Sequence, residues 1–232
     1  MRAVVSCLMI VLLAGACATP PKDEVARVAA QRLEALLGRP IVVLHVKSDF
    51  NEGNGDPGRV RIWVGAADDD DLSISFSASW DDGDLRFAED ALEGRFARTV
   101  RSVAQTRVFL EKARGHLTHY GVRADVRKDG AVDLTLRLFE PACEGPGCTV
   151  FERLARAVAA FSHDCAAPLS LSVTLQEPLG TLPAEGGEII DRERPPGDRD
   201  KWRPGLATYH IDGLEACPAP AAPALRAALR FN

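Results

Sequence analysis

Hydrophobic and polar side chains alternate strictly over residues 72–80. Leu72, Ile74 and Phe76 belong to one face of the expected strand and the intervening serines to the other. This pattern is typical of an antiparallel strand with one buried and one solvated face. Shorter alternating or β-branched runs predict further strands at residues 41–47, 60–64, 122–128, 131–140, 169–175 and 206–211.

Apolar residues at helical spacing predict three helices, over residues 23–37, 88–120 and 149–161. The longest has a seven-residue hydrophobic repeat, but threonines at the companion positions favour a packed amphipathic helix over a coiled coil. We expect Gly121 to end this helix. Thr149 is expected to cap the helix that follows it.

Burial determines the expected register of the hairpin between residues 122–128 and 131–140. A two-residue turn would set Val126 opposite Asp133, which pairs an apolar side chain with a charged one. A three-residue loop, residues 128–130, aligns the apolar positions of both strands on one face. We therefore expect the longer loop, with Gly130 in the left-handed conformation.

The element order αβββα–ββαββ predicts an α+β fold, with antiparallel sheet or sheets and helices packed on one face. We expect one half over residues 23–120, which ends in the long helix, and a second half over residues 121–217. The second half contains a long loop of charged residues, Pro and Gly at 178–205. Residues 218–232 form an expected Pro/Ala linker and tail. Whether the halves share one sheet or form two is left open.

The first sixteen residues have the features of an export signal. Arg2 precedes an apolar run that is too short to cross a bilayer. Small residues then lead directly to Cys17, in the sequence Leu-Ala-Gly-Ala-Cys over residues 13–17. This segment resembles the lipobox of bacterial lipoproteins. An ordinary secretory signal cut after Ala16 is the alternative.

The lipobox resemblance implies that the signal peptide, residues 1–16, is removed and that Cys17 carries fatty acyl chains such as palmitate. It also implies an anchored protein of the cell envelope. Ala18, after the acylated cysteine, favours the outer membrane, on the side that faces the periplasm. The tether at residues 17–22 is short, so we expect the folded body to lie close to the bilayer.

Four cysteines remain in the expected mature body, an even number that suggests disulfides in an exported chain. Turn-forming residues between Cys143 and Cys148 favour a bridge between these two. Cys165 would then pair with Cys217. A four-cysteine zinc site is the alternative, although its spacing is atypical.

Composition and motifs limit the functions that we expect for this chain. A net charge of −5 argues against binding to a nucleic-acid backbone. The sequence contains no phosphate loop, nucleophile elbow or His-Glu-x-x-His motif, and we expect no catalytic residues and no cofactor. Weak candidates for a calcium site are the oxygen-rich positions Asp49, Asn51, Asn54 and Asp56. His116 and His119 are a further pair, predicted to share a helix face.

Three apolar residues interrupt the charged 178–205 loop. Ile189, Ile190 and Trp202 could contact a partner or pack back onto the sheet. We expect a membrane-anchored lipoprotein that acts as a non-catalytic binding or assembly module for an envelope protein, glycan or lipid. The alternatives are a tethered hydrolase-like periplasmic enzyme with a dispersed active site and a calcium-dependent binding module.

Overall fold

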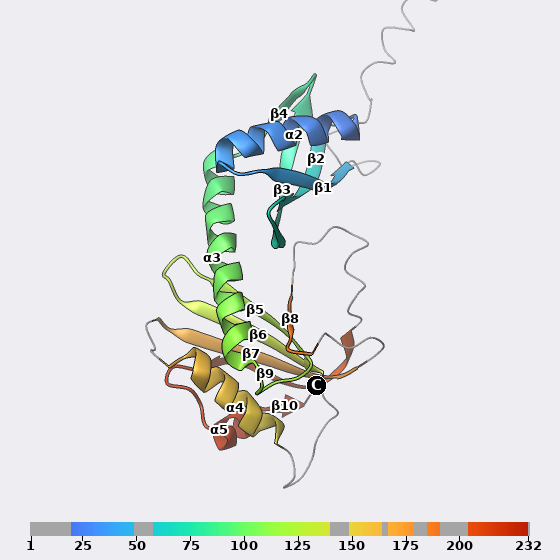
Figure 1. Ribbon diagram of the computed structural model, residues 1–232. Helices are drawn as coiled ribbons and strands as arrows, with labels where there is room; N and C mark the ends of the chain where they lie inside the picture. The colour runs from blue at the N-terminus through green and yellow to red at the C-terminus, as the bar shows by residue number, and fades with distance from the viewer. Residues whose placement is uncertain are drawn as a thin grey trace, which may run out of the picture. The chain divides into compact units, whose positions relative to one another are not determined.

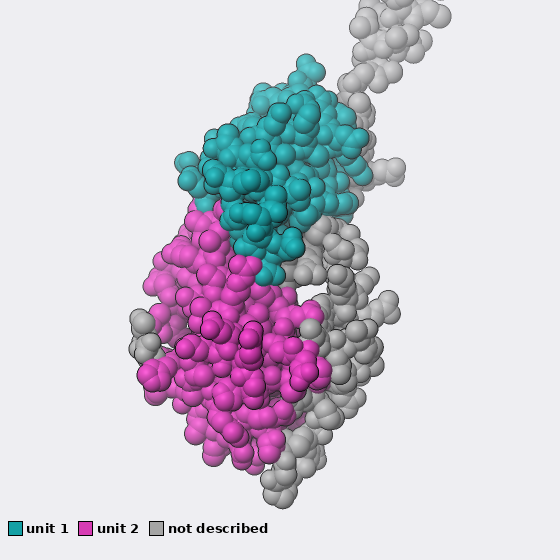
Figure 2. Space-filling model, viewed as in Figure 1, with its two compact units in different colours: residues 1–93 teal, residues 94–232 magenta. Residues whose placement is uncertain are grey.

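The computed structural model describes residues 20–48, 58–139, 149–163, 167–178, 185–190 and 204–231. The chain divides into two compact units, Met1–Glu93 and Gly94–Asn232 (Figure 2). Each unit contains a sheet with helices (Figure 1). The fold is therefore α+β, as the sequence predicts, and there are two sheets.

The first unit is built on a four-stranded antiparallel sheet in the order β1-β2-β3-β4. The strands are β1 (Ile41–Ser48), β2 (Arg59–Ala66), β3 (Asp69–Asp81) and β4 (Asp84–Arg86). Helix α2 (Lys22–Leu37) contacts both edge strands, β1 and β4, so it lies across the sheet. It buries Val25, Ala29 and Leu33, and the strands bury alternate residues that include Ile62 and Ile74.

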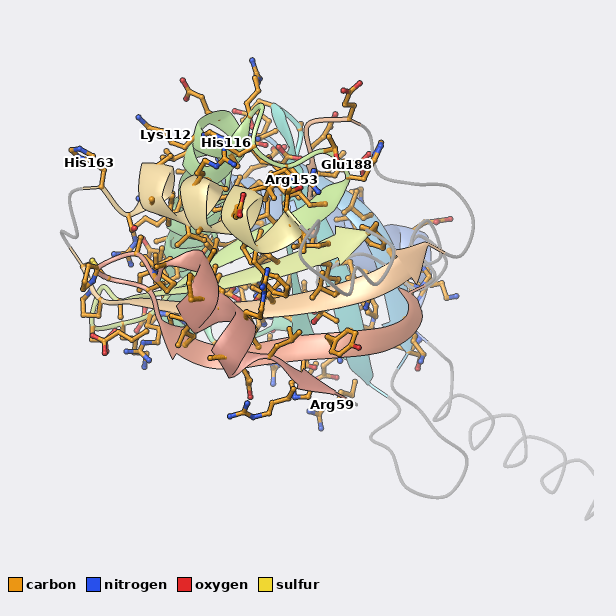
Figure 3. All side chains as sticks on the ribbon, turned by 90° about the horizontal axis from the view of Figure 1, so that it is seen from below. Arg59, Lys112, His116, Arg153, His163 and Glu188 are labelled. Atoms are coloured by element: carbon orange, nitrogen blue, oxygen red, sulfur yellow. The ribbon has the colours of Figure 1, made fainter. Side chains whose placement is uncertain are left out.

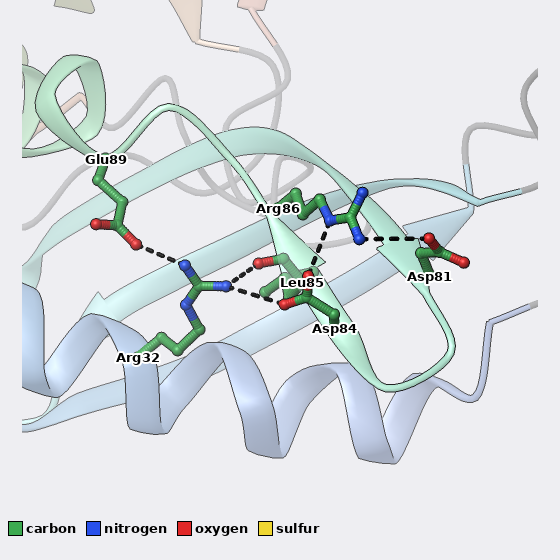
Figure 4. A network of polar contacts seen from close by, with 6 residues as sticks. All are labelled: Arg32, Asp81, Asp84, Leu85, Arg86 and Glu89. Atoms are coloured by element: carbon green, nitrogen blue, oxygen red, sulfur yellow. Dashed lines mark hydrogen bonds and ion pairs between the residues drawn. The ribbon is translucent and has the colours of Figure 1, made fainter.

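Arg32 ties α2 to the edge of this sheet (Figure 4). Its guanidinium donates hydrogen bonds to the Leu85 carbonyl and, at 2.6 Å, to Glu89. The same group lies 3.5 Å from Asp84 and 5.0 Å from the centre of the Phe87 ring. These contacts hold a short edge strand that offers only three residues for pairing.

The serine face of β3 is solvated at Ser77 and Ser79, as expected, but not at Ser73 and Ser75. Ser73 and Ser75 are buried, and so is Trp63. Arg61 donates a 3.1 Å hydrogen bond to the Ser75 hydroxyl, and its guanidinium lies 5.3 Å from the centre of the Trp63 ring. The alternation was predicted correctly, but serine tolerates burial when its hydroxyl is hydrogen-bonded.

The second unit contains a six-stranded sheet in the order β10-β9-β7-β6-β5-β8. Its strands are β5 (Tyr120–Val126), β6 (Val132–Phe139), β7 (Leu169–Pro178), β8 (Glu188–Ile189), β9 (Pro204–Glu215) and β10 (Arg230–Phe231). Most pairs are antiparallel, but β6·β7 and β5·β8 are parallel. The β6·β7 pair is parallel because a helix crosses over between these strands.

One hydrophobic core joins the six-stranded sheet to its helices. The helices are α3 (Glu89–Ala113), α4 (Val150–Phe161) and α5 (Ala222–Ala228), and α4 contacts α5 (Figure 3). Phe109 of α3 is fully buried and meets the rings of Tyr120 and Phe161 edge-on. The C-terminal half of α3 therefore belongs to the second unit. The predicted boundary between the halves, at residue 120, differs from this division within α3.

The β5–β6 hairpin has the register expected from burial. Val126 pairs with Val132, and Ala124 pairs with Leu134. The Arg127 amide donates a 2.8 Å hydrogen bond to the Ala131 carbonyl, which closes a three-residue loop. Gly130 has a φ of 85°, in the left-handed region, as predicted.

Some helix boundaries differ from expectation. α3 ends at Ala113, seven residues before the predicted end. Gly115, with a φ of 81°, turns the chain there, and Tyr120 begins β5. α4 begins where predicted, but Thr149 makes no side-chain capping hydrogen bond.

The outer edge of β5 is covered in two ways. The Thr106 hydroxyl of α3 accepts a 2.9 Å hydrogen bond from the Ala124 amide, and Ser102 accepts one from Val126 at the same distance. Nearer the start of the strand, the Ile190 amide donates to the Val122 carbonyl at 2.8 Å. The backbone amides and the carbonyl named above on the outer edge of β5 thus have hydrogen-bond partners, which protects the strand against pairing with another chain.

Tyr120 makes the stability of the second unit sensitive to alkaline pH. The side chain is fully buried, and its hydroxyl has no hydrogen-bond partner among the described residues. Desolvation by burial raises the pKa of Tyr120 to about 12, compared with about 10 in an unfolded chain. Between these values the unfolded state releases a proton that the folded state retains, so stability falls as pH rises.

We expect Tyr120→Phe to remove this dependence. Wild type should lose on the order of 2 kcal/mol more unfolding free energy than the variant between pH 10 and 12. At pH 7 the variant should be at least as stable, because it lacks a buried hydroxyl without a partner. Urea denaturation across this pH range measures the difference, and identical alkaline slopes would contradict the assignment.

Candidate ligand-binding site

A cavity of about 380 Å³ opens in the second unit. It lies between α3, the β5–β6 hairpin, the end of α4, the start of β7 and the segment after β9. This volume is within the range of small-molecule sites, at its lower end. The lining residues are Arg101, Ala104, Gln105, Val108, Val126, Gly130, Val132, Phe161, Ser162, Ala167, Leu169 and Cys217.

The α3 residues that line the cavity form one wall because of their helical spacing. Arg101, Ala104, Gln105 and Val108 follow each other at intervals of three, one and three residues, so they share one side of the helix. The rotation of the helix is fixed on the adjoining side, where Phe109 enters the core and Thr106 bonds the edge of β5.

The hairpin loop provides a second wall. Gly130 lines the cavity with a positive φ, and a β-carbon at this position would meet no atom within 4 Å. Val126 and Val132, a registered pair, flank the loop. The three-residue loop therefore determines both the pairing and the shape of this wall.

Apolar groups dominate the lining. Leu169 is 5% exposed, and Val132 is 9% exposed. Val108, in contrast, is 41% exposed, which leaves apolar surface for a ligand to cover. Arg101 and Gln105 supply most of the polar groups.

The Ser162 hydroxyl and the Cys217 sulfur, which line the cavity, already have bonding partners. Ser162 donates a 2.8 Å hydrogen bond from its hydroxyl to the Val158 carbonyl. Cys217 is disulfide-bonded. Among the described residues that line the cavity there is no carboxylate and no imidazole. Among its described residues, the lining therefore presents no acid–base pair.

The charged side chains near the cavity differ in whether they are paired. The Ala131 amide and the Arg127 guanidinium hold the pKa of Asp129 below its usual value. Arg127 lies 3.0 Å from Asp129 and 3.9 Å from Asp133, so its charge is offset. Arg101 is exposed and has no ion pair or hydrogen bond within the described part of the chain. It is also the charged side chain among the described residues that line the cavity.

Several predicted sites lie outside the described residues. These are Cys17, the calcium candidates Asp49, Asn51, Asn54 and Asp56, the cysteines Cys143, Cys148 and Cys165, and Trp202. Cys217 is described and is bonded through a disulfide. Its pairing with Cys165 stays a prediction, as does the Cys143–Cys148 bridge.

The histidines do not form a metal site in the described structure. His116, which Figure 3 labels, lies beyond the end of α3. His119 follows in the same turn before β5, so the two residues do not share a helix face. The long-helix prediction that paired them was wrong because the helix ends at Ala113. Within the described ranges, no group of three or more His, Cys, Asp or Glu side chains is placed to hold a metal ion.

Ile189 and Ile190 lie at the edge of the six-stranded sheet. Ile189 pairs with Val122, and the Ile190 side chain lies over Gly121. Both residues are half-buried. This geometry corresponds to packing onto the sheet, the second of the two arrangements expected for these residues. Contact of the surrounding loop with a partner stays a prediction.

Sequence reasoning missed the cavity because its walls come from five separate parts of the chain. One local signal was available: Ala104 and Val108 are small or apolar residues four positions apart, on the same side of the helix as Arg101 and Gln105. Without the hairpin and α4, those positions are indistinguishable from ordinary helix surface.

No protein-family model and no curated protein match the chain. Within its described residues, no helix has the length and apolar character needed to span a membrane. Among solved structures, a DUF5037 family protein from Ruminococcus gnavus is similar in backbone, with a TM-score of 0.46 and 11% sequence identity. The similarity covers 66% of this chain and 75% of that one. The function must therefore be inferred from the residues of this chain.

Proposed function

We propose that this chain is a membrane-anchored envelope lipoprotein that acts as a non-catalytic binding module, with the cavity of the second unit as its ligand site. The observation that carries the proposal is the chemistry of the lining. Aliphatic and aromatic walls are combined with one guanidinium and one amide, while the hydroxyl of Ser162 and the sulfur of Cys217 are engaged elsewhere. Such a site can hold and orient a molecule without transforming it.

The anchor in this proposal is supported by the sequence. Small residues lead to Cys17 directly after a short apolar run, as in bacterial lipoproteins. Two or three acyl chains on one residue are sufficient for stable membrane attachment. Only four residues, 18–21, lie between Cys17 and the start of α2 at Lys22, so the folded body would lie at the membrane surface. We propose that it faces the periplasm from the outer membrane.

Filling the cavity is expected to abolish binding of an apolar molecule. Ala104 lines the cavity and Ala97 does not, although both are exposed positions on α3, seven residues apart. Ala104→Trp should weaken binding of the neutral dye N-phenyl-1-naphthylamine by about tenfold or more, because the indole would occupy the space that the dye needs. Ala97→Trp should leave it unchanged. Fluorescence titration of the mature chain, residues 17–232 with Cys17→Ser, measures both.

Equal dye affinity in wild type and Ala104→Trp would contradict the assignment of this cavity as a ligand site. Circular dichroism of both variants serves as the folding control. A cavity that binds no dye in the wild-type chain would contradict the proposal as well.

A further inference from the structure

We infer that the cavity takes a single-chain amphipathic anion, an alkyl chain that ends in a carboxylate or a phosphate. The inference rests on the proposed function and adds to it the chemical class of the ligand. It follows from three features of the cavity: its apolar walls, the charge at its rim and its size.

The walls fit an alkyl chain. Val126, Val132, Phe161 and Leu169 present hydrocarbon to the space, and no described lining residue carries a buried charge. An alkyl chain has no hydrogen-bonding groups to leave unsatisfied in such surroundings. It would also cover the exposed side chain of Val108. Removal of the alkyl chain and of the Val108 side chain from water favours binding.

The rim fits an anionic head group. Arg101 and Gln105 are one turn apart on the same side of α3, and both are exposed. A guanidinium donates two parallel hydrogen bonds to a carboxylate or phosphate, and the Gln105 amide can donate another. Arg127 on the hairpin is paired with Asp129 and Asp133, whereas Arg101 has no ion pair among the described residues, so its guanidinium is available to the head group.

The volume favours one chain. A cavity of about 380 Å³ is near the lower limit for small-molecule sites. A two-chain phospholipid would leave most of its hydrocarbon outside. A fatty acid or a single-chain lipid phosphate would place a substantial part of its chain within the walls.

Four probes with the same chain and different heads test the inference. Octanoate, octyl phosphate, 1-octanol and octylammonium are titrated into the mature chain with Cys17→Ser, and amide signals of Ala104 and Gly130 are followed by NMR. We expect at least one anion to bind about tenfold more tightly than the alcohol, and octylammonium to bind least. Octanoate as the tighter anion indicates a fatty acid, and octyl phosphate a lipid phosphate.

A pair of variants locates the head group. Arg101→Gln should weaken binding of the preferred anion about tenfold or more, and should leave the alcohol unchanged. Arg98→Gln, on the same helix but outside the lining, should change neither. Equal affinity of anion and ammonium, or an unchanged anion affinity in Arg101→Gln, would overturn the inference.

The ligand class and the binding function of the cavity can be refuted separately. If the alcohol binds as tightly as the anions and Ala104→Trp blocks it, the cavity is a ligand site without preference for anions, and only the ligand class is wrong. If no octyl probe shifts the signals of Ala104 and Gly130, the ligand class is also overturned, and the dye titration decides separately whether the cavity binds apolar molecules.

Discussion

Gly187→Ala is expected to detach β8 from the six-stranded sheet. Gly187 has a φ of 87°, a conformation that side-chain-bearing residues rarely adopt. A β-carbon at this position would lie 2.6 Å from ring carbons of Tyr120, which is itself fully buried and cannot move aside without disturbing the core. The combined cost of backbone strain and overpacking is about 2–4 kcal/mol.

Hydrogen exchange reports this detachment directly. The Ile190 amide donates to Val122 and the Gly186 amide donates to Thr118, both within or beside β8. In Gly187→Ala both amides should exchange at least tenfold faster than in wild type.

The neighbouring glycine provides a matched control. Gly186 also has a positive φ, of 99°, but a β-carbon there would meet no atom within 4 Å. Gly186→Ala should therefore show the backbone cost alone, about 1–2 kcal/mol. If both variants exchange at the same rate at Ile190, the contact between Gly187 and Tyr120 does not hold β8 in place.

Cys17→Ser is expected to abolish acylation completely. The hydroxyl of serine cannot replace the thiol that carries the diacylglyceryl group in the lipoprotein family, so labelled palmitate should appear in wild type and be absent from the variant. The variant should also leave the membrane fraction, because the anchor supplies the hydrocarbon that holds the protein there. Cys7→Ser, within the apolar run of the signal, is the control and should be labelled like wild type. Equal membrane retention of Cys17→Ser and wild type would contradict the lipid anchor.

Structural features that depend on residues close together in the sequence were predicted correctly. The β5–β6 register follows from the requirement that Val126 and Val132 share the buried face. The start of β7 at Leu169 and the burial of Leu171 and Val173 likewise follow from strict alternation, although the strand continues three residues beyond the predicted end, to Pro178.

Features that depend on distant residues were not predicted. The apolar spacing of Leu117 and Tyr120 continues that of α3, so the pattern alone cannot show that Gly115 ends the helix and that both residues join the sheet core. β8 has two residues, too few for any periodicity, and exists because Gly187 and Gly121 allow close approach to Tyr120 and Ile190. The cavity combines residues 101 to 217, so only the assembled fold brings Arg101 to its rim.

Mass spectrometry of the mature N-terminus tests the lipid anchor at Cys17. Trypsin acts after Lys22, so the proposed mature protein yields a peptide of residues 17–22. We expect this peptide to begin at Cys17 and to carry a diacylglyceryl group on its sulfur. An unmodified Cys17 within a peptide that begins at Ala3, or a mature chain that begins at Cys17 without lipid, would contradict it.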